Sequence, residues 1–191
     1  MYLFFDTETT GLPKVRQAPL RQLDNWPRLV QLAWLAYGMD GHLLQRGEVI
    51  IKPAGFTIPE AATKIHGITT ALAAREGRDI EEVLQEFQKL AASATILVGH
   101  HLWFDLMVVS AEFLRKELPN ALQGKKEICT MLASTAFCGI PGPYGCKWPR
   151  LADLYMKLFG RGFENAHSAG ADIAATAECF WELKRRGVIT V

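Results

Sequence analysis

Short apolar runs in the first 52 residues predict three β-strands. Residues 2–5 are uniformly apolar and predict a short buried strand, while residues 29–37 form a longer, mostly apolar run. Turn-forming residues 39–42 separate this run from residues 43–52, so we expect the second and third strands to pair as a hairpin. Residues 13–28 are rich in Pro and basic side chains and predict a loop.

The spacing of apolar residues becomes helical after residue 78. Asp79 is a suitable N-cap, and Glu82 three residues later would complete a capping box. The apolar residues that follow fall on one face of a helix. They are Ile80, Val83, Leu84, Phe87 and Leu90.

Helices and short strands are expected to alternate in the rest of the chain. We expect strands at residues 95–98 and 127–130, and a Gly/Pro-rich loop at residues 139–149. The alternation predicts an α/β layered fold, and the length predicts one domain covering residues 1–191. Further helices are expected at residues 102–117, 150–159 and 169–186.

The composition excludes several classes of protein. Hydrophobic residues make up 49% of the chain and charged residues 21%, which argues against disorder. The formal net charge is +1, so a polyanionic partner would have to be bound through local basic patches or bound cations. No apolar run approaches the roughly 20 residues that cross a bilayer, and the first residues do not predict a signal peptide. The four cysteines lack metal-ligand spacing, so we expect reduced thiols in a cytoplasmic protein and no zinc site.

Acidic residues follow predicted strands at three places. Asp6 and Glu8 share one face at the end of the first strand, where they either bind a cation or lie solvated at the strand end. Asp105 falls in the first turn of a predicted helix, where it either joins a site or only complements the helix dipole. His167 and Asp172 lie ahead of and inside the last helix, and the His is either a catalyst or a structural group.

The combination of these residues favours chemistry at phosphorus. Ligands of open α/β sheets bind where strands end. Two metal ions about 3.5–4 Å apart need several carboxylates and little else, and a nearby imidazole can take a proton from water. This inventory indicates an in-line displacement assisted by Mg²⁺ or Mn²⁺.

Four segments of the chain resemble the DnaQ-like proofreading exonucleases. Residues 4–13, FFDTETTGLP, resemble the first motif of this family, and residues 99–105, GHHLWFD, resemble the second. His167-x4-Asp172, followed by an Ala-Thr pair, resembles the third motif in the form that defines the DEDDh subgroup. A sister subgroup has Tyr-x3-Asp there, which this spacing excludes. Residues 65–69, IHGIT, resemble a further family segment.

The resemblance implies an RNase H-like fold, in which helices cover both faces of a mixed sheet, and a two-metal site. It implies that Asp6, Glu8 and Asp172 hold the catalytic metal ion directly. Asp6 would bridge to a second ion, which Asp105 would help to hold. His167 would be the general base that deprotonates the attacking water.

The resemblance also implies contacts with the terminal nucleotide, with one departure from the family pattern. The second motif is usually Gly-His-Asn, but residues 99–101 are Gly-His-His, which puts substrate positioning at this point in doubt more than the chemistry. The main chain after Asp6 would cradle the nucleotide, a leucine would wedge beside its base, and a histidine would approach from the opposite side. The implied substrate-binding residues are Thr7, Thr10, Gly11, Leu12, His66 and His101.

We therefore expect a metal-dependent 3′→5′ exonuclease that releases nucleoside 5′-monophosphates from single-stranded or 3′-end nucleic acid, in proofreading or repair. DNA is favoured over RNA, a DNA polymerase subunit is a candidate partner, and no membrane association is expected. Two alternatives stay open, namely an RNA-trimming exoribonuclease and a non-catalytic module that binds nucleic acid or a polymerase.

Basic and aromatic residues near these motifs have two interpretations each. The basic residues of two predicted loops either hold phosphates or are solvated. Trp103 either stacks on a base or packs beside Phe104. The basic residues are Lys14, Arg16, Arg21 and Arg28 in the first loop, and Lys147 and Arg150 beside the Gly/Pro-rich loop.

Overall fold

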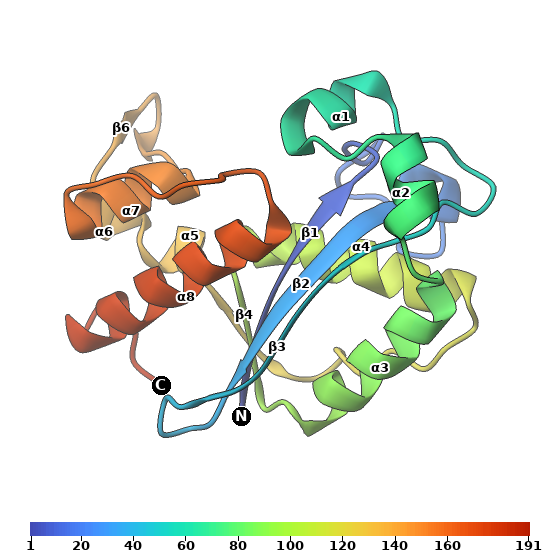
Figure 1. Ribbon diagram of the computed structural model, residues 1–191. Helices are drawn as coiled ribbons and strands as arrows, with labels where there is room; N and C mark the ends of the chain where they lie inside the picture. Colours follow the sequence, from blue (N-terminus) through green and yellow to red (C-terminus); the bar gives the residue numbers. More distant parts are fainter.

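A mixed five-stranded sheet runs through the centre of the molecule (Figure 1). The computed structural model describes all 191 residues. The strand order is β3-β2-β1-β4-β5, with β1 antiparallel to β2 and parallel to β4. The predicted hairpin of the second and third strands is confirmed, because β2 pairs antiparallel with β3. The strands are β1 Tyr2–Thr9, β2 Leu29–Tyr37, β3 Leu43–Ile50, β4 Ile96–Gly99 and β5 Lys126–Cys129.

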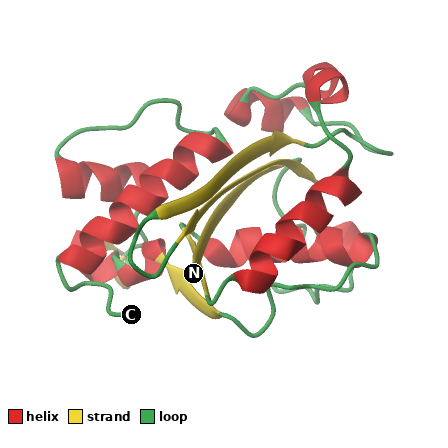
Figure 2. Ribbon diagram, turned by 60° about the horizontal axis from the view of Figure 1, so that its bottom comes forward, coloured by secondary structure: helices red, strands yellow, loops and turns green.

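Helices cover both faces of this sheet, as Figure 2 shows from a second direction. Helices α3 and α4 lie on one face, and α7 and α8 lie on the other. This arrangement confirms the expected α/β class. The bounds are α3 Ile80–Ser93, α4 Leu102–Arg115, α7 Leu151–Phe159 and α8 Ala169–Arg185.

The alternation of side chains along β1 divides the core into two halves. Leu3 and Phe5 belong to a cluster of 21 buried residues that includes the apolar faces of α3 and α4. Tyr2 and Phe4 point the other way, into a cluster of 18 buried residues with α7 and α8. Because β1 is buried on both faces, its residues form a continuous apolar run in the sequence.

Asp79 caps α3 as the sequence predicts. Its Oδ1 accepts hydrogen bonds from the backbone N–H groups of Glu81 at 2.8 Å and Glu82 at 3.3 Å. The structure shows no return bond from the Glu82 side chain, so only the Asp79 half of the expected capping box forms. Ile80, Val83, Leu84 and Phe87 are buried on the predicted face, and Leu90 is half-buried beside them.

Two short helices that the hydrophobic pattern does not predict lie beside the C-terminal end of β1 (Figure 1). These are α1 Glu60–His66 and α2 Thr70–Glu76. Gly67 ends α1 in the left-handed conformation, and the Thr69 hydroxyl caps α2 by accepting from the Leu72 N–H at 3.0 Å. Both helices rest on a separate cluster of five buried residues, so they form a smaller unit than the halves around the sheet.

The remaining differences from the expected elements are small. The first strand continues to Thr9, so it includes the acidic residues that we expected at its end. The Gly/Pro-rich loop contains a small hairpin whose two strands have two residues each, and residues 130–138 form two short helices. No helix has the length and apolar character needed to cross a bilayer. These additional elements are η1 Leu23–Asn25, α5 Thr130–Ala133, α6 Thr135–Cys138, β6 Pro141–Gly142 and β7 Gly145–Cys146.

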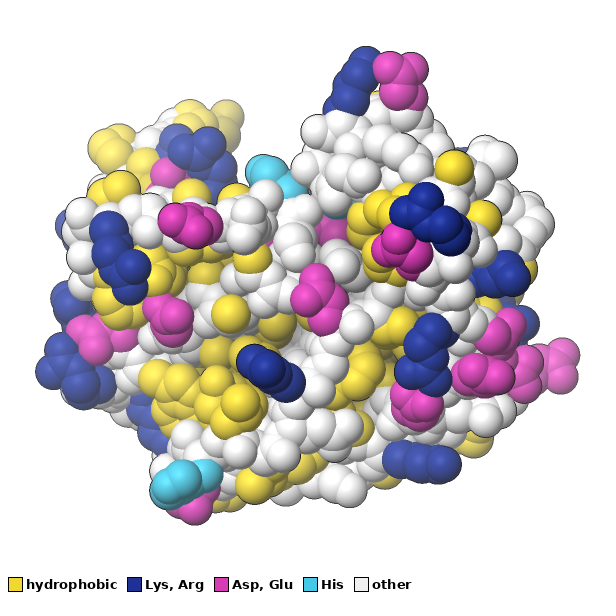
Figure 3. Space-filling model, in the orientation of Figure 1, with side chains coloured by type: hydrophobic (Ala, Val, Ile, Leu, Met, Phe, Trp, Pro, Cys, Tyr) yellow, Lys and Arg dark blue, Asp and Glu magenta, His cyan; other side chains and the backbone are white.

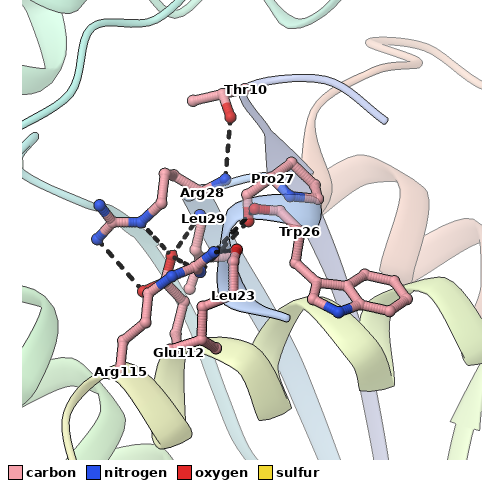
Figure 4. Close-up of polar contacts among 8 residues, drawn as sticks. All are labelled: Thr10, Leu23, Trp26, Pro27, Arg28, Leu29, Glu112 and Arg115. Carbon is pink, nitrogen blue, oxygen red and sulfur yellow. Dashed lines mark hydrogen bonds and ion pairs between the residues drawn. The ribbon is translucent and has the colours of Figure 1, made fainter. Parts of the chain in front are cut away.

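A buried ion-pair network attaches the long loop after β1 to helix α4 (Figure 4). Glu112 of α4 is fully buried, and its Oε1 receives the Arg28 Nε at 2.8 Å, the Arg115 Nη1 at 2.9 Å and the Leu29 N–H at 3.1 Å. The Arg28 backbone N–H in turn donates to the Thr10 hydroxyl at 2.9 Å. Both ends of the loop are therefore joined to each other and to α4.

Arg115 completes this network from the other side of the loop. Its Nη2 donates to the carbonyl oxygens of Leu23 at 2.7 Å and Trp26 at 2.8 Å (Figure 4). Irregular backbone near a protein interior needs such partners because unpaired carbonyl groups are costly. Arg115 thus satisfies loop carbonyl groups, and both arginines neutralise the Glu112 carboxylate.

We predict that Glu112→Ala lowers the free energy of unfolding by about 3–5 kcal/mol, because two arginines lose their buried partner. Urea denaturation measures this loss. Glu86→Ala is the matched control, because Glu86 makes a bidentate pair with Arg78 at the exposed surface and its loss should be small. If the two variants lost the same free energy of unfolding, the buried network would contribute no more to stability than the exposed ion pair.

Candidate active site

Three acidic side chains predicted from the sequence meet beside the C-terminal half of β1. Asp6 and Glu8 point to the same face of the sheet as Tyr2 and Phe4, which is the face that α8 covers. Asp172 lies in the first turn of α8. Asp6, Glu8 and Asp172 each offer a carboxylate oxygen within 4.8 Å of the others. The i, i+2 spacing on one strand and the packing of α8 on that strand therefore create the cluster.

Asp105 approaches β1 from the opposite face and is held there by Thr7. The Asp105 Oδ1 accepts from the Thr7 hydroxyl at 2.7 Å and from the Thr7 N–H at 3.1 Å. Both residues are buried. Thr7 therefore positions the Asp105 carboxylate, and a contact between its main chain and a nucleotide stays a prediction.

Burial raises the pKa values of all four carboxyl groups, and neighbouring carboxylates add to the shift for Asp6, Glu8 and Asp105. Burial, and then the charges of Asp172 and Asp105, raise the pKa of Glu8 to about 8. Burial raises the pKa of Asp105 to about 7 although the hydrogen bonds from Thr7 oppose this shift. Burial and the three neighbouring carboxylates raise the pKa of Asp6 well above its ordinary range, and burial raises that of Asp172. The cluster is therefore short of positive charge.

The donor set fits a hard divalent cation. None of the four carboxylates forms a salt bridge with a lysine or arginine. Carboxylate oxygens are the ligands that Mg²⁺ and Mn²⁺ prefer, and a bound cation relieves repulsion between close acids. The acidic cluster could therefore hold a metal ion, with Asp6, Glu8 and Asp172 as direct ligands.

The surface is hollowed between the two sides of the molecule at this point. Figure 3 shows the hollow between the α8 side and the α1–α2 side, with histidine and acidic side chains visible in it. Lysine and arginine side chains are spread over this face and do not gather in the hollow. A ligand can thus reach the cluster from solvent.

Gln31 of β2 caps helix α8, and Glu48 of β3 supports it, a contact that the sequence did not predict. The Gln31 Oε1 accepts from the Ala169 N–H at 3.1 Å, and Glu48 accepts from the Ser168 hydroxyl at 3.1 Å and from the Gln31 amide at 2.9 Å. Gly170 permits this contact, since a Cβ there would lie 2.2 Å from a Glu48 oxygen. The hairpin therefore sets the position of the helix that carries Asp172.

His167 lies just before α8 with its side chain exposed. Its backbone N–H donates to the Asp172 Oδ2 at 3.2 Å, and its φ of 71° places it in the left-handed region that histidine and asparagine adopt more readily than most residues. The imidazole makes no hydrogen bond within the protein. The structure thus brings His167 to the acidic cluster and leaves its ring available.

The segment after Thr9 forms the rim of the site. Thr10 pairs with Arg28 in both directions, since its N–H donates to the Arg28 carbonyl at 3.0 Å and its hydroxyl accepts from the Arg28 N–H. Gly11 has a φ of 146°, a backbone conformation that residues other than glycine rarely adopt. Leu12 then projects outward with 81% of its surface exposed. An exposed leucine at this rim is available to contact a ligand.

His66 lies on the α1 side of the site. Its Nδ1 accepts from the Ile68 N–H at 3.1 Å, while its Nε2 is shielded from solvent without a hydrogen-bond partner. Burial lowers the pKa of His66, although the Thr9 backbone opposes this shift. The lowered pKa favours a neutral ring at the α1 side of the site.

His101 retains the backbone conformation that an asparagine would adopt at this position. It is the N-cap of α4 with a φ of 72°, in the left-handed region that both Asn and His favour. Its ring lies parallel to that of Phe104, with centroids 6.1 Å apart. Burial and the charge of Arg16 lower the pKa of His101. The departure from the family motif therefore changes the side chain and leaves the main chain in place.

A comparison with solved structures confirms the RNase H-like exonuclease fold. Exonuclease I from E. coli, in complex with a dT13 oligonucleotide, superposes with a TM-score of 0.76 and 24% identity over 97% of this chain and 41% of that chain. Exonuclease I from Methylocaldum szegediense gives a TM-score of 0.71 and 23% identity over 97% of this chain and 40% of that chain.

Curated relatives have higher identity but are much longer proteins. A DNA polymerase III subunit epsilon-like protein of Rhodobacter capsulatus is 33% identical over 99% of this chain, and a PolC-type DNA polymerase III of Streptococcus pneumoniae is 30% identical over 92%. The chain spans only 25% and 10% of the lengths of these two relatives.

The family model described as Exonuclease, RNase_T, matches residues 3–180, which include β1, α4 and most of α8. All four acidic residues and His167 lie inside this match. With the shared fold and the motif order, the match shows that the chain belongs to the RNase_T exonuclease family and confirms its resemblance to the DnaQ-like exonucleases.

Proposed function

We propose that this chain is a metal-dependent 3′→5′ exonuclease that releases nucleoside 5′-monophosphates from the end of a DNA strand. One observation carries the proposal: Asp6, Glu8 and Asp172 present oxygens within 4.8 Å of one another without any basic partner. Family membership supports nuclease chemistry at such a cluster. An acidic cluster of this kind has no structural use that would repay its repulsion.

The residues of the chain divide the chemistry among them. Divalent cations held by Asp6, Glu8 and Asp172, with Asp105 beside them, would activate the attacking water and neutralise charge on the leaving oxygen. An imidazole nitrogen of His167 would accept the proton of that water while its oxygen bonds to phosphorus. The bond from phosphorus to the 3′-oxygen then breaks, and the leaving oxygen takes a proton from solvent. Leu12 and His66 would hold the terminal nucleotide from two sides.

DNA is the proposed substrate, and a DNA polymerase is the proposed type of partner. The relatives named for DNA polymerase III and the exonuclease I structures with DNA oligonucleotides support both proposals. Any partner and any further activity of the longer relatives remain proposals for this chain, because it spans a small part of their length.

A digestion of matched, end-labelled DNA and RNA 12-mers tests the activity. With Mg²⁺ we expect nucleotides to be released first from the 3′ end, faster from DNA, and no release with a chelator present. Asp6→Ala should abolish release and Glu86→Ala should retain it, because Glu86 lies outside the cluster in an exposed pair. Release from the 5′ end, or wild-type activity in Asp6→Ala, would refute the assignment.

We predict that His167→Ala lowers kcat by about 10²–10⁴, because the general base is lost. His42→Ala is the control, since His42 is exposed in the β2–β3 turn. A loss of less than a few-fold in kcat would place the base elsewhere.

We further predict that Mg²⁺ stabilises the protein more at pH 8 than at pH 5. The raised pKa values mean that the metal-free folded state holds protons that the unfolded state releases, so stability falls as pH rises from about 4.5 to about 8. Bound Mg²⁺ favours the ionised carboxylates and reverses this loss.

Thermal unfolding with and without Mg²⁺ at several pH values measures the effect. Glu8→Gln should raise the metal-free Tm at pH 8 and reduce the Mg²⁺-induced shift, since it removes one crowded charge. Glu86→Gln should change neither property, since Glu86 pairs with Arg78 away from the cluster. A Mg²⁺-induced shift that is the same at every pH would contradict the proposed relief of charge.

A further inference from the structure

Two tryptophans and an arginine meet outside the carboxylate cluster, at the N-terminal end of α4. The Arg16 guanidinium lies 5.6 Å from the ring centroid of Trp103 and 5.3 Å from that of Trp148. The centroid of the His101 ring lies 6.3 Å from that of Trp103 and 6.4 Å from that of Trp148. We call these residues the tryptophan cluster: Arg16, His101, Trp103 and Trp148.

The tryptophan cluster begins one helical turn from the candidate active site. His101 is the N-cap of α4, four residues before Asp105. Asp105 is fixed to β1 through Thr7. A strand that ran from the carboxylates past the N-terminus of α4 would meet His101 and the two tryptophans.

The rings are anchored but remain open to solvent. Trp103 packs edge-on against the buried Trp26, with centroids 5.8 Å apart, and still exposes 37% of its surface. Trp148 exposes 49% from the Gly/Pro-rich loop. Trp103 thus packs against Trp26 while part of its ring stays open to solvent.

A groove of about 930 Å³ runs from this cluster toward β5 and the C-terminal residues. Its size is at the upper end of the range of about 300–1,000 Å³ that is typical of ligand sites. The Nε2 of His101 is shielded from solvent without a hydrogen-bond partner. The groove therefore combines the aromatic surfaces of Trp103 and Trp148 with the His101 ring in its lining.

The positive charges around the groove are free, which indicates a polyanionic occupant. Arg16 and Lys126, which line the groove, form no salt bridge, and neither does Lys147, the neighbour of Trp148 in the sequence. Arg28 and Arg150, in contrast, are paired with Glu112 and Asp153. Unpaired cations interleaved with exposed aromatic rings are typical of surfaces that bind single-stranded nucleic acid.

We propose that the tryptophan cluster binds the nucleotides that lie 5′ to the terminal residue of single-stranded DNA. Bases stack on Trp103 and Trp148, and Arg16 and Lys147 contact the phosphates between them. This inference rests on the exonuclease function proposed above and adds the path of the strand. A protein segment as the occupant of the groove is the alternative that the test must distinguish.

Two substrates separate this groove from the chemistry. A dT12 oligonucleotide reaches the cluster, whereas the p-nitrophenyl ester of thymidine 5′-monophosphate has no upstream nucleotides. Stacking on an aromatic side chain changes affinity by about fivefold to about hundredfold per base. We expect Trp148→Ala to raise KM for dT12 by such a factor relative to its effect on the ester, while kcat at saturating dT12 stays near that of the wild type. Trp148→Phe should restore most of the loss.

Binding of labelled dT12 by fluorescence anisotropy gives a readout that does not need catalysis. In the Asp6→Ala background we expect Trp148→Ala to weaken binding by the same factor and to weaken binding of dT2 much less. Met156→Ala is the matched control, because Met156 exposes 50% of its surface on α7 outside the groove. Trp148 lies in a loop, so a Tm near that of the wild type is expected for each variant.

The outcomes are distinguishable from a failure of the proposed function. If the wild type cleaves neither substrate, the exonuclease proposal fails, while anisotropy still reports on the groove. Equal losses on dT12 and on the ester would show that Trp148 supports the active site structurally. Unchanged affinity for dT12 in Trp148→Ala would show that the strand takes another path and leave the groove to a protein partner. Either of the last two results overturns the inference.

Discussion

Repulsion among buried carboxylates is the constraint on which the arrangement of this protein depends. Asp6 and Glu8 sit on β1, the central strand of the sheet, where neither can move away from the other without breaking strand pairing. Asp172 and Asp105 are brought to them from opposite faces. A folded state that keeps four acids together accepts a stability cost in the absence of a cation, and the surrounding structure must prevent the acids from separating.

Two polar networks resist this separation, one on each side of β1. The Gln31–Glu48 pair holds the start of α8 and thereby Asp172. The Glu112 network holds the long loop against α4, the helix that carries Asp105. Each network contains a buried polar side chain, Gln31 in the first and Glu112 in the second, which is costly unless it is satisfied. The acidic cluster is therefore held in part by buried groups that themselves require hydrogen-bond partners.

Local sequence information accounts for the acids but not for the groups that hold them. The spacing of Asp6 and Glu8, the cap at Asp79 and the hairpin were predictable because each depends on neighbours within a few residues. Helices α1 and α2 were not, since seven residues each are too few for a periodic pattern. The α8 cap was not predictable either, because Gln31 and Ala169 are 138 residues apart and no local pattern relates them. The role of Thr7 likewise depends on a partner 98 residues away.

The small cluster beneath α1 and α2 gives the site two walls of unequal stiffness. Five buried residues support these helices, whereas 21 and 18 support the two halves around the sheet. Segments with few buried contacts open at a lower free-energy cost than the rest of a protein. The wall that carries His66 can thus move at a lower free-energy cost than the wall that carries Asp172. In the proposed exonuclease, capture and release of a terminal nucleotide would then need no displacement of the acidic side chains.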